Sequence, residues 1–271
     1  QGVEQNWEEA VRWYRAAAEQ DYPRALCNLA WCYEHSKGVE QDYPEAARLY
    51  LRAAEQDYPR GQLCMGFCCE RGRGVPLDPS AAADWYRKAA EQEDEDAQCC
   101  LGFLYESGQG VEQSWEKAVK LYEASAQRGY PPAQCALGYC YEVGSGTAED
   151  KTKAAEWYEK AARRGYAPAQ CNLGFFYDRG VGVAEDAAKA VEWYERAAEQ
   201  GYAPAQCNLG LCYENGEVVE QSWEQAAALY LKSAQADYAP GMCNYAWCCE
   251  FGKGVEKDLA EAFRWFSAAA G

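Results

Sequence analysis

Histidine is almost missing from this chain of 271 residues, which has one, His35, together with only two methionines. A single histidine leaves too few side chains for most acid-base chemistry and for the usual zinc sites. No apolar run approaches the roughly 18 residues that span a bilayer, so we expect no membrane segment. Basic residues are also in deficit, because 26 Lys and Arg stand against 43 Asp and Glu and give a net charge of −17. Such a chain repels phosphate backbones, so we expect no nucleic-acid partner.

The beginning of the chain has no feature of a signal peptide. Residues Gln1 to Gln5 are polar and lack both a basic and an apolar region. The sequence has no initiating Met, opens inside a repeat and stops just after a predicted helix. We therefore expect further repeats or another domain to flank it in a longer protein.

A repeat of 36 residues runs through the sequence. A column of small residues recurs at this interval, at Ala25, Gly61, Ala97, Ala133, Ala169, Ala205 and Gly241. A fixed interval of this length is typical of stacked supersecondary units, none of which can bury its apolar face alone. We therefore predict one continuous repeat domain over residues 1–271.

Each repeat has the pattern of two helices. In the first, Ala25, Leu29, Cys32 and Tyr33 have the spacing of one helix face. A Gly-x-Gly-Val segment then suits a helix end and a chain reversal, and a capping residue such as Asp42 begins the second helix. We predict an all-α fold with a leading helix over residues 7–20 and seven helix pairs that start near residues 24, 60, 96, 132, 168, 204 and 240. The acidic run over residues 93–96 is expected to be a solvated loop.

The 15 cysteines mostly follow the repeat as well. Cys27 and Cys32 are five residues apart, which turns their thiols to different sides of a helix. Equivalent cysteines of neighbouring repeats would be on the order of 10 Å apart, beyond the reach of a disulfide. This spacing does not converge on a tetrahedral metal site, and we predict no metal and no cofactor. We expect reduced, mostly buried cysteines and a cytoplasmic protein.

The repeats follow the pattern Ala-x-x-x-Leu-Gly-x-x-Tyr-x-x-Gly-x-Gly-Val and then Ala-x-x-Trp-Tyr-x-x-Ala-Ala, which is clearest over residues 169–198 and over residues 97–126, where Leu121 and Ser125 replace the Trp and the first Ala of the second half. This pattern resembles the Sel-1-like repeat, a relative of the tetratricopeptide repeat. The resemblance implies a right-handed α/α superhelix, or solenoid, and an adaptor or scaffold that binds peptides or proteins. Cysteine-rich members of the family are secreted and have a disulfide whose upstream position is here Ala17, Ala53 or Ser125. That difference counts against a secreted protein.

By the same resemblance, the first helices line a concave groove, and two columns of side chains face it. The predicted peptide-binding residues are Asn28, Trp31, Phe67, Arg71, Phe103, Tyr139, Asn172, Phe175, Arg179, Asn208, Leu211, Asn244 and Trp247. Large rigid side chains with amide donors between them suit an extended or helical peptide. The alternative is that the aromatic residues pack between neighbouring first helices and the asparagines bridge repeats.

An acidic residue also recurs every 36 residues beside these columns, and we call this set the acidic row: Glu34, Glu70, Glu106, Glu142, Asp178, Glu214 and Glu250. It favours a basic ligand, or else it forms salt bridges with residues such as Arg71 and Arg179.

One motif raises an enzymatic alternative. Ser114 and Lys117 match the Ser-x-x-Lys of penicillin-recognising enzymes, and some secreted members of the family are linked to β-lactam binding. Ser114, however, occupies the capping column, and neither Ser-Asp-Asn nor Lys-Thr-Gly is present. We predict a non-catalytic scaffold, and the alternative is a secreted-type repeat protein with β-lactam binding or weak hydrolase activity.

Overall fold

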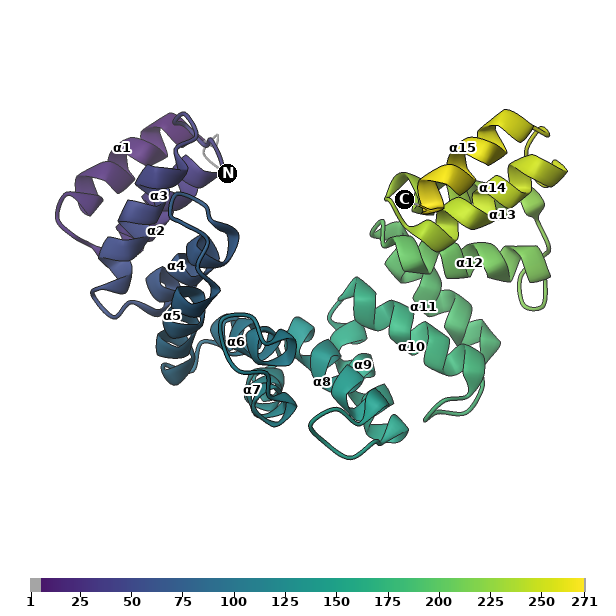
Figure 1. Ribbon diagram of the computed structural model, residues 1–271, viewed down its shortest axis with the longest axis horizontal. Helices are drawn as coiled ribbons and strands as arrows, with labels where there is room; N and C mark the ends of the chain where they lie inside the picture. Colours follow the sequence, from purple (N-terminus) through teal and green to yellow (C-terminus); the bar gives the residue numbers. More distant parts are fainter. Residues whose placement is uncertain (1–5, 271) are drawn as a thin grey trace, which may run out of the picture. The chain divides into compact units, whose positions relative to one another are not determined.

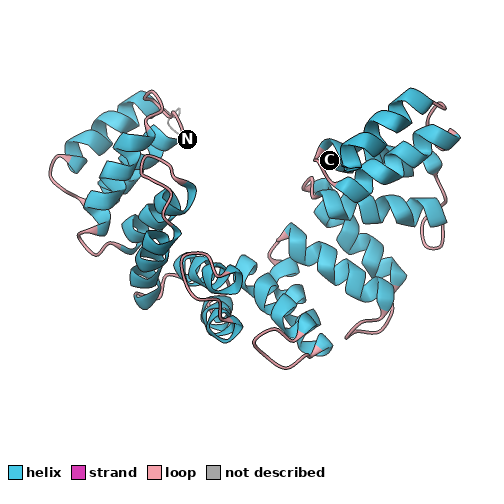
Figure 2. Ribbon diagram, in the orientation of Figure 1, coloured by secondary structure: helices cyan, strands magenta, loops and turns pink. Residues whose placement is uncertain are grey.

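The computed structural model describes residues 6–270, and over this range the chain forms fifteen α-helices and no strand (Figures 1 and 2). Helix α1 (Trp7–Ala18) leads, and seven helix pairs follow it. The first helices of the pairs are α2 (Pro23–Glu34), α4 (Pro59–Arg71), α6 (Glu95–Ser107), α8 (Pro131–Val143), α10 (Ala167–Arg179), α12 (Ala203–Asn215) and α14 (Ala239–Phe251). The second helices are α3 (Tyr43–Ala54), α5 (Pro79–Glu91), α7 (Trp115–Gln127), α9 (Lys151–Arg163), α11 (Ala187–Glu199), α13 (Trp223–Gln235) and α15 (Leu259–Ala270).

The all-α solenoid prediction is confirmed, and each pair begins one residue before its predicted start. The polar segment 1–5, which bears on the signal-peptide prediction, lies outside the described residues. Within residues 6–270 no helix has the length and apolar character needed to cross a lipid bilayer.

Side-chain caps and glycines set the helix boundaries as the sequence predicts. Asp150 accepts a hydrogen bond from the backbone N–H of Lys153 at 3.0 Å, and the same column caps the other second helices. Each cap satisfies a backbone donor that the helix leaves without an intrahelical partner. At the other end, Gly180 closes α10 in the left-handed region with φ 63°. Residues with a Cβ adopt this conformation rarely, which explains the glycine of the reversal.

The chain divides into two compact units, one of residues 1–133 with 145–147 and the other of residues 134–144 with 148–271. In each unit, consecutive helices pack against one another, as α2 does with α3 and α12 with α13. First helices also meet directly, α2 with α4 in one unit and α12 with α14 in the other. The single continuous domain stays a prediction.

The glycine that follows the apolar residue in the middle of a first helix, as in Leu173-Gly174 and Met65-Gly66, lies under a buried tyrosine of the second helix. At Gly174, a Cβ would be 2.7 Å from the ring atom Cε1 of Tyr194, and at Gly66 it would be 2.3 Å from Cε1 of Tyr86. Both tyrosines are buried. Glycine at this position therefore allows the tyrosine ring to lie close to the backbone of the first helix, and a larger residue would push the two helices apart.

The cysteines fill the core. Within residues 6–270, ten of the fifteen cysteines are buried, and Cys243 is the exposed one. The prediction that they are mostly buried is confirmed. Burial raises the pKa of Cys27 and Cys171 to about 12, which keeps these thiols protonated and poorly nucleophilic.

Candidate peptide-binding surface

Seven large side chains recur at one position of the first helices, and we call them the aromatic row: Trp31, Phe67, Phe103, Tyr139, Phe175, Leu211 and Trp247. The last five are exposed, with exposed fractions between 38% and 46%, and the first two are half-buried. Three members belong to the first compact unit and four to the second. A recurring exposed apolar position is unusual on a folded surface.

Four rings of the aromatic row, those of Trp31, Phe67, Phe103 and Trp247, pack against other aromatic residues. Phe103 meets the edge of Tyr122 with ring centroids 5.3 Å apart, and Phe67 meets Tyr86 at 5.5 Å. In the last pair, Trp247 packs on Trp223 at 5.6 Å. Phe67, Phe103 and Trp247 therefore combine packing against a second helix with an accessible outer face.

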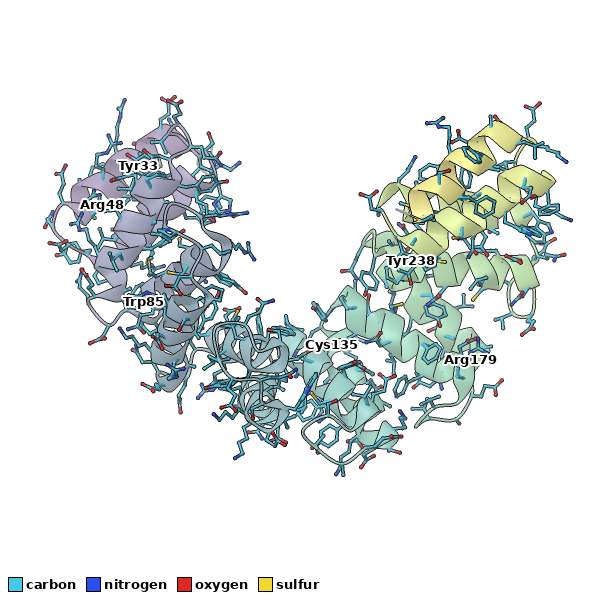
Figure 3. All side chains as sticks on the ribbon, in the orientation of Figure 1. Tyr33, Arg48, Trp85, Cys135, Arg179 and Tyr238 are labelled. Atoms are coloured by element: carbon cyan, nitrogen blue, oxygen red, sulfur yellow. The ribbon has the colours of Figure 1, made fainter. Side chains whose placement is uncertain are left out.

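The predicted asparagines connect neighbouring repeats in the second unit. Asn172 Nδ2 donates to Cys135 Sγ at 3.8 Å, and Asn208 Nδ2 donates to Cys171 Sγ at 3.6 Å. Asn244 Nδ2 makes the equivalent contact with Cys207 at 3.4 Å. A thiol is a weak acceptor, so a peptide carbonyl would be a better partner for these amides. In Figure 3, Cys135 lies on α8 well away from Arg179, which ends α10.

The acidic row has partners that the sequence did not reveal. Tyr158 donates its hydroxyl to Glu142 Oε2 at 2.6 Å, and Tyr86 donates to Glu70 Oε2 at 2.7 Å. The same bond recurs in three other pairs, between Tyr50 and Glu34, Tyr122 and Glu106, and Tyr230 and Glu214. Burial is the main cause that raises the pKa of Tyr158 and Tyr230, and the neighbouring carboxylate raises it further.

The predicted arginine partners of the acidic row are only half right. Arg179 Nε lies 3.1 Å from Asp178 Oδ2, as an ion pair requires. Arg71 instead lies over the ring of Phe67, with its guanidinium carbon 5.3 Å from the ring centroid. Most of the row is therefore held by tyrosine hydroxyls, which weakens the reason to expect a basic ligand.

A pocket of about 540 Å³ opens in the first unit and brings together three of the predicted residues. Its lining residues are Arg24, Cys27, Asn28, Trp31, Glu34, His35, Tyr50, Tyr58, Arg60, Leu63, Cys64, Phe67 and Asp96. A second pocket of about 190 Å³ shares Glu34, Cys64 and Phe67 with it and adds Cys68, Arg71 and Arg73. Arg24, Arg60 and Arg73 were absent from the prediction, although Arg24 and Arg60 share one column.

The acidic run at 93–96 contributes to this pocket, and the expectation of a solvated loop is wrong for most of it. Asp94 caps α6 by accepting from the backbone N–H of Ala97 at 2.9 Å, and Glu95 and Asp96 form the first turn. Burial raises the pKa of Asp94. Carboxylates at a helix start are stabilised by the helix dipole, which explains why the run lies there.

His35 ends α2 as an exposed residue. Its Nδ1 lies 3.0 Å from the carbonyl oxygen of Trp31, and the two rings stack with centroids 4.6 Å apart. In the described part of the chain, no three His, Cys, Asp or Glu side chains lie where they could hold a metal ion together.

The model of the Sel1 repeat matches residues 1–22, 23–58, 59–94, 95–130, 131–166, 167–202, 203–238 and 239–270, which is almost the whole chain. The chain belongs to the Sel1 repeat family. No curated protein matches it significantly.

Solved Sel1 repeat structures agree with this assignment. A protective antigen of uropathogenic Escherichia coli with an SLR fold is 32% identical with a TM-score of 0.71, and the match covers 100% of this chain and 66% of that one. A Sel1 repeat protein from Oxalobacter formigenes is 32% identical with a TM-score of 0.74, covering 96% and 75%. An immunity protein from Pseudomonas aeruginosa, 24% identical with a TM-score of 0.51 over 70% and 73%, shares the fold alone. The Sel1 repeat chain thus spans just under two thirds of the first of these proteins.

Ser114 of this Sel1 repeat chain works as a helix cap. Its Oγ accepts from the backbone N–H of Lys117 at 3.3 Å and donates to Glu116 Oε2 at 3.2 Å. The ammonium group of Lys117 lies over the ring of Tyr105, 5.1 Å from its centroid. These contacts give both residues of the Ser-x-x-Lys motif a structural role.

Proposed function

We propose that this Sel1 repeat protein is a non-catalytic scaffold that binds a peptide or protein segment on the surface of its first helices. The observation that carries the proposal is the aromatic row, whose members recur every 36 residues with an open outer face. Aromatic side chains supply large contact areas at a small entropic cost, and they dominate binding energies at interfaces. We place the protein in the cytoplasm, because its many cysteines are mostly buried in the core as small apolar side chains.

The asparagines add polar recognition to this surface. Asn172, Asn208 and Asn244 are half-buried, and each holds a long hydrogen bond to a thiol. A backbone carbonyl of a bound peptide can replace the thiol as acceptor without leaving a buried donor unpaired. Leu211 and Arg179 continue the surface on α12 and α10.

Selection of phage-displayed random peptides by the full chain tests the proposal. Peptides that the protein enriches are synthesised with a fluorophore, and their affinity is measured by fluorescence anisotropy. Phe103→Ala and Phe175→Ala are expected to weaken binding by about 30-fold, or about 2 kcal/mol, where the residue is an anchor. Trp13→Ala is the control, because this exposed tryptophan on α1 is not a member of the aromatic row. Unchanged affinity in Phe67→Ala, Phe103→Ala and Phe175→Ala alike would refute the proposal.

Stability separates recognition from packing. Phe176, the neighbour of Phe175, is 1% exposed, so Phe176→Ala should cost about 3 to 5 kcal/mol of unfolding free energy. Phe175→Ala should cost much less, because the ring is 43% exposed. Equal losses of stability, together with unchanged peptide affinity, would show that the aromatic row packs between repeats.

A further inference from the structure

The pockets of the first unit contain a local excess of positive charge on a strongly negative protein. Four arginines line the two adjoining pockets, Arg24, Arg60, Arg71 and Arg73, against two carboxylates, Glu34 and Asp96. The whole chain has a net charge of −17. Because the Debye length is about 8 Å at physiological ionic strength, these nearby arginines outweigh the distant acidic residues for a ligand inside the pocket.

Both carboxylates of the pockets already have partners. Glu34 accepts from Arg73 Nη1 at 3.1 Å and from the hydroxyl of Tyr50 at 3.1 Å. Asp96 accepts a hydrogen bond from Tyr130 and lies close enough to Arg60 for their charges to interact. An arginine therefore offsets part of the negative charge of each carboxylate.

The arginines, in contrast, have capacity to spare. Over residues 6–270, Arg24, Arg60 and Arg71 form no ion pair with a carboxylate. Arg24 and Arg60 are both exposed and occupy the first turns of α2 and α4. A guanidinium presents a planar fork of donors that matches a carboxylate in two parallel hydrogen bonds.

The positive charge of Arg24 and Arg60 is specific to the first two pairs of helices. The residues equivalent to Arg24 and Arg60 in the later repeats are Asp96, Pro132, Pro168, Pro204 and Pro240. The corresponding surface of the second unit therefore lacks this pair of guanidinium groups. The first unit has a charge preference that the repeat pattern alone does not require.

The aromatic row supplies the apolar part of the same pocket. Trp31 and Phe67 are half-buried, and Trp31 is held between Trp7, at 5.5 Å, and His35, at 4.6 Å. Fixed rings beside exposed guanidinium groups can take an apolar side chain and a neighbouring carboxylate at the same time.

We propose that the pocket of the first unit binds an acidic peptide segment, with Arg24 and Arg60 taking its carboxylates and Trp31 and Phe67 taking an adjacent apolar side chain. This inference rests on the proposed function and specifies the chemistry of the partner. It replaces the basic ligand that the acidic row suggested from the sequence.

The charge of the peptides selected from the random phage library tests the inference. We expect enrichment of Asp and Glu next to aromatic or aliphatic residues. For a selected acidic peptide, Arg24→Glu or Arg60→Glu should weaken binding by at least about tenfold, and Arg24→Lys by less. Arg164→Glu, at an exposed helix end of the second unit, makes the same change in net charge and should leave the affinity unchanged.

Circular dichroism checks that each variant keeps its helices. Enrichment of basic or neutral peptides, or acidic peptides that bind the Arg24 and Arg60 variants as well as the unaltered chain, would overturn the acidic preference and leave the scaffold proposal standing. A selection that enriches no peptide would overturn both.

Discussion

Removing one tyrosine hydroxyl tests whether the bond between helices of a pair stabilises the repeat. Tyr158 is fully buried and donates to Glu142 Oε2 at 2.6 Å. In Tyr158→Phe the ring keeps its packing, but the half-buried carboxylate loses this donor. Hydrogen bonds to charged groups contribute about 1.5 to 3 kcal/mol, so we expect a loss of that size in the free energy of unfolding.

A matched control is present two helices further along. Tyr194 occupies the equivalent position, but it faces Asp178, whose side chain is shorter by one methylene. Among the described residues, Tyr194 and Asp178 form no hydrogen bond, and Asp178 pairs with Arg179 at 3.1 Å. Tyr194→Phe should therefore cost less than about 1 kcal/mol. Both tyrosines belong to the second unit.

Urea unfolding followed by circular dichroism measures the two losses. Because repeat proteins can unfold in parts, amide hydrogen exchange of α8, α9, α10 and α11 should accompany the urea curves. Tyr158→Phe should speed exchange in α8 and α9 more than Tyr194→Phe speeds it in α10 and α11. Equal free-energy losses in the two variants would refute the role assigned to the hydroxyl and carboxylate bond.

Two further predictions concern buried amides and alkaline pH. Gln206 Oε1 is buried without a hydrogen-bond partner, whereas Gln170 Oε1 accepts from Gln200 Nε2 at 2.7 Å. Ala236 stands where Gln200 does in the previous repeat, so Ala236→Gln should raise the free energy of unfolding by about 0.5 to 1.5 kcal/mol, and an unchanged urea midpoint would contradict this. Burial raises the pKa of Cys171 from 9.0 to about 12, and other buried cysteines share this shift. As the pH rises, the thiols of the unfolded state lose their protons before those of the folded state. The contribution of the buried thiols to the free energy of unfolding is therefore complete below about pH 9 and declines above it. A urea midpoint that stays constant from about pH 8 to pH 11 would argue against the shifts.

The 36-residue period made the helices predictable. Each repeat encodes its own caps, and residues such as Asp150 and Gly180 set helix ends through local hydrogen bonds and backbone conformation. The first helix of each pair therefore begins within one residue of its predicted start. Local signals of this kind can be read from the sequence, because their partners lie three or four residues away.

The pocket of the first unit could not be predicted in the same way. Arg24, Arg60 and Asp96 come from α2, α4 and α6, and only the stacking of these helices brings them to one cavity. The partner of the acidic row was missed for a related reason. The columns of tyrosine and glutamate are both visible in the sequence, but the rotation of one helix against the other decides whether they meet. One indication of the pocket was visible in the sequence, which is that the residue type changes along one column, from Arg60 to Asp96 in the next repeat.

Several side-chain hydrogen bonds that recur between helices have the same sequence separations in each repeat where they occur. They join residues 16 apart within a pair, as in Tyr158 and Glu142, and residues 30 or 37 apart between neighbouring repeats, as in Gln200 with Gln170 and Asn172 with Cys135. Duplication or loss of a block of 36 residues restores these separations on both sides of the junction. A gene for this chain can therefore change its number of repeats by unequal recombination while each new junction keeps its hydrogen bonds. A site that is not repeated along the chain, such as the pocket of the first unit, can then arise by point substitution in single repeats while the other repeats keep the fold.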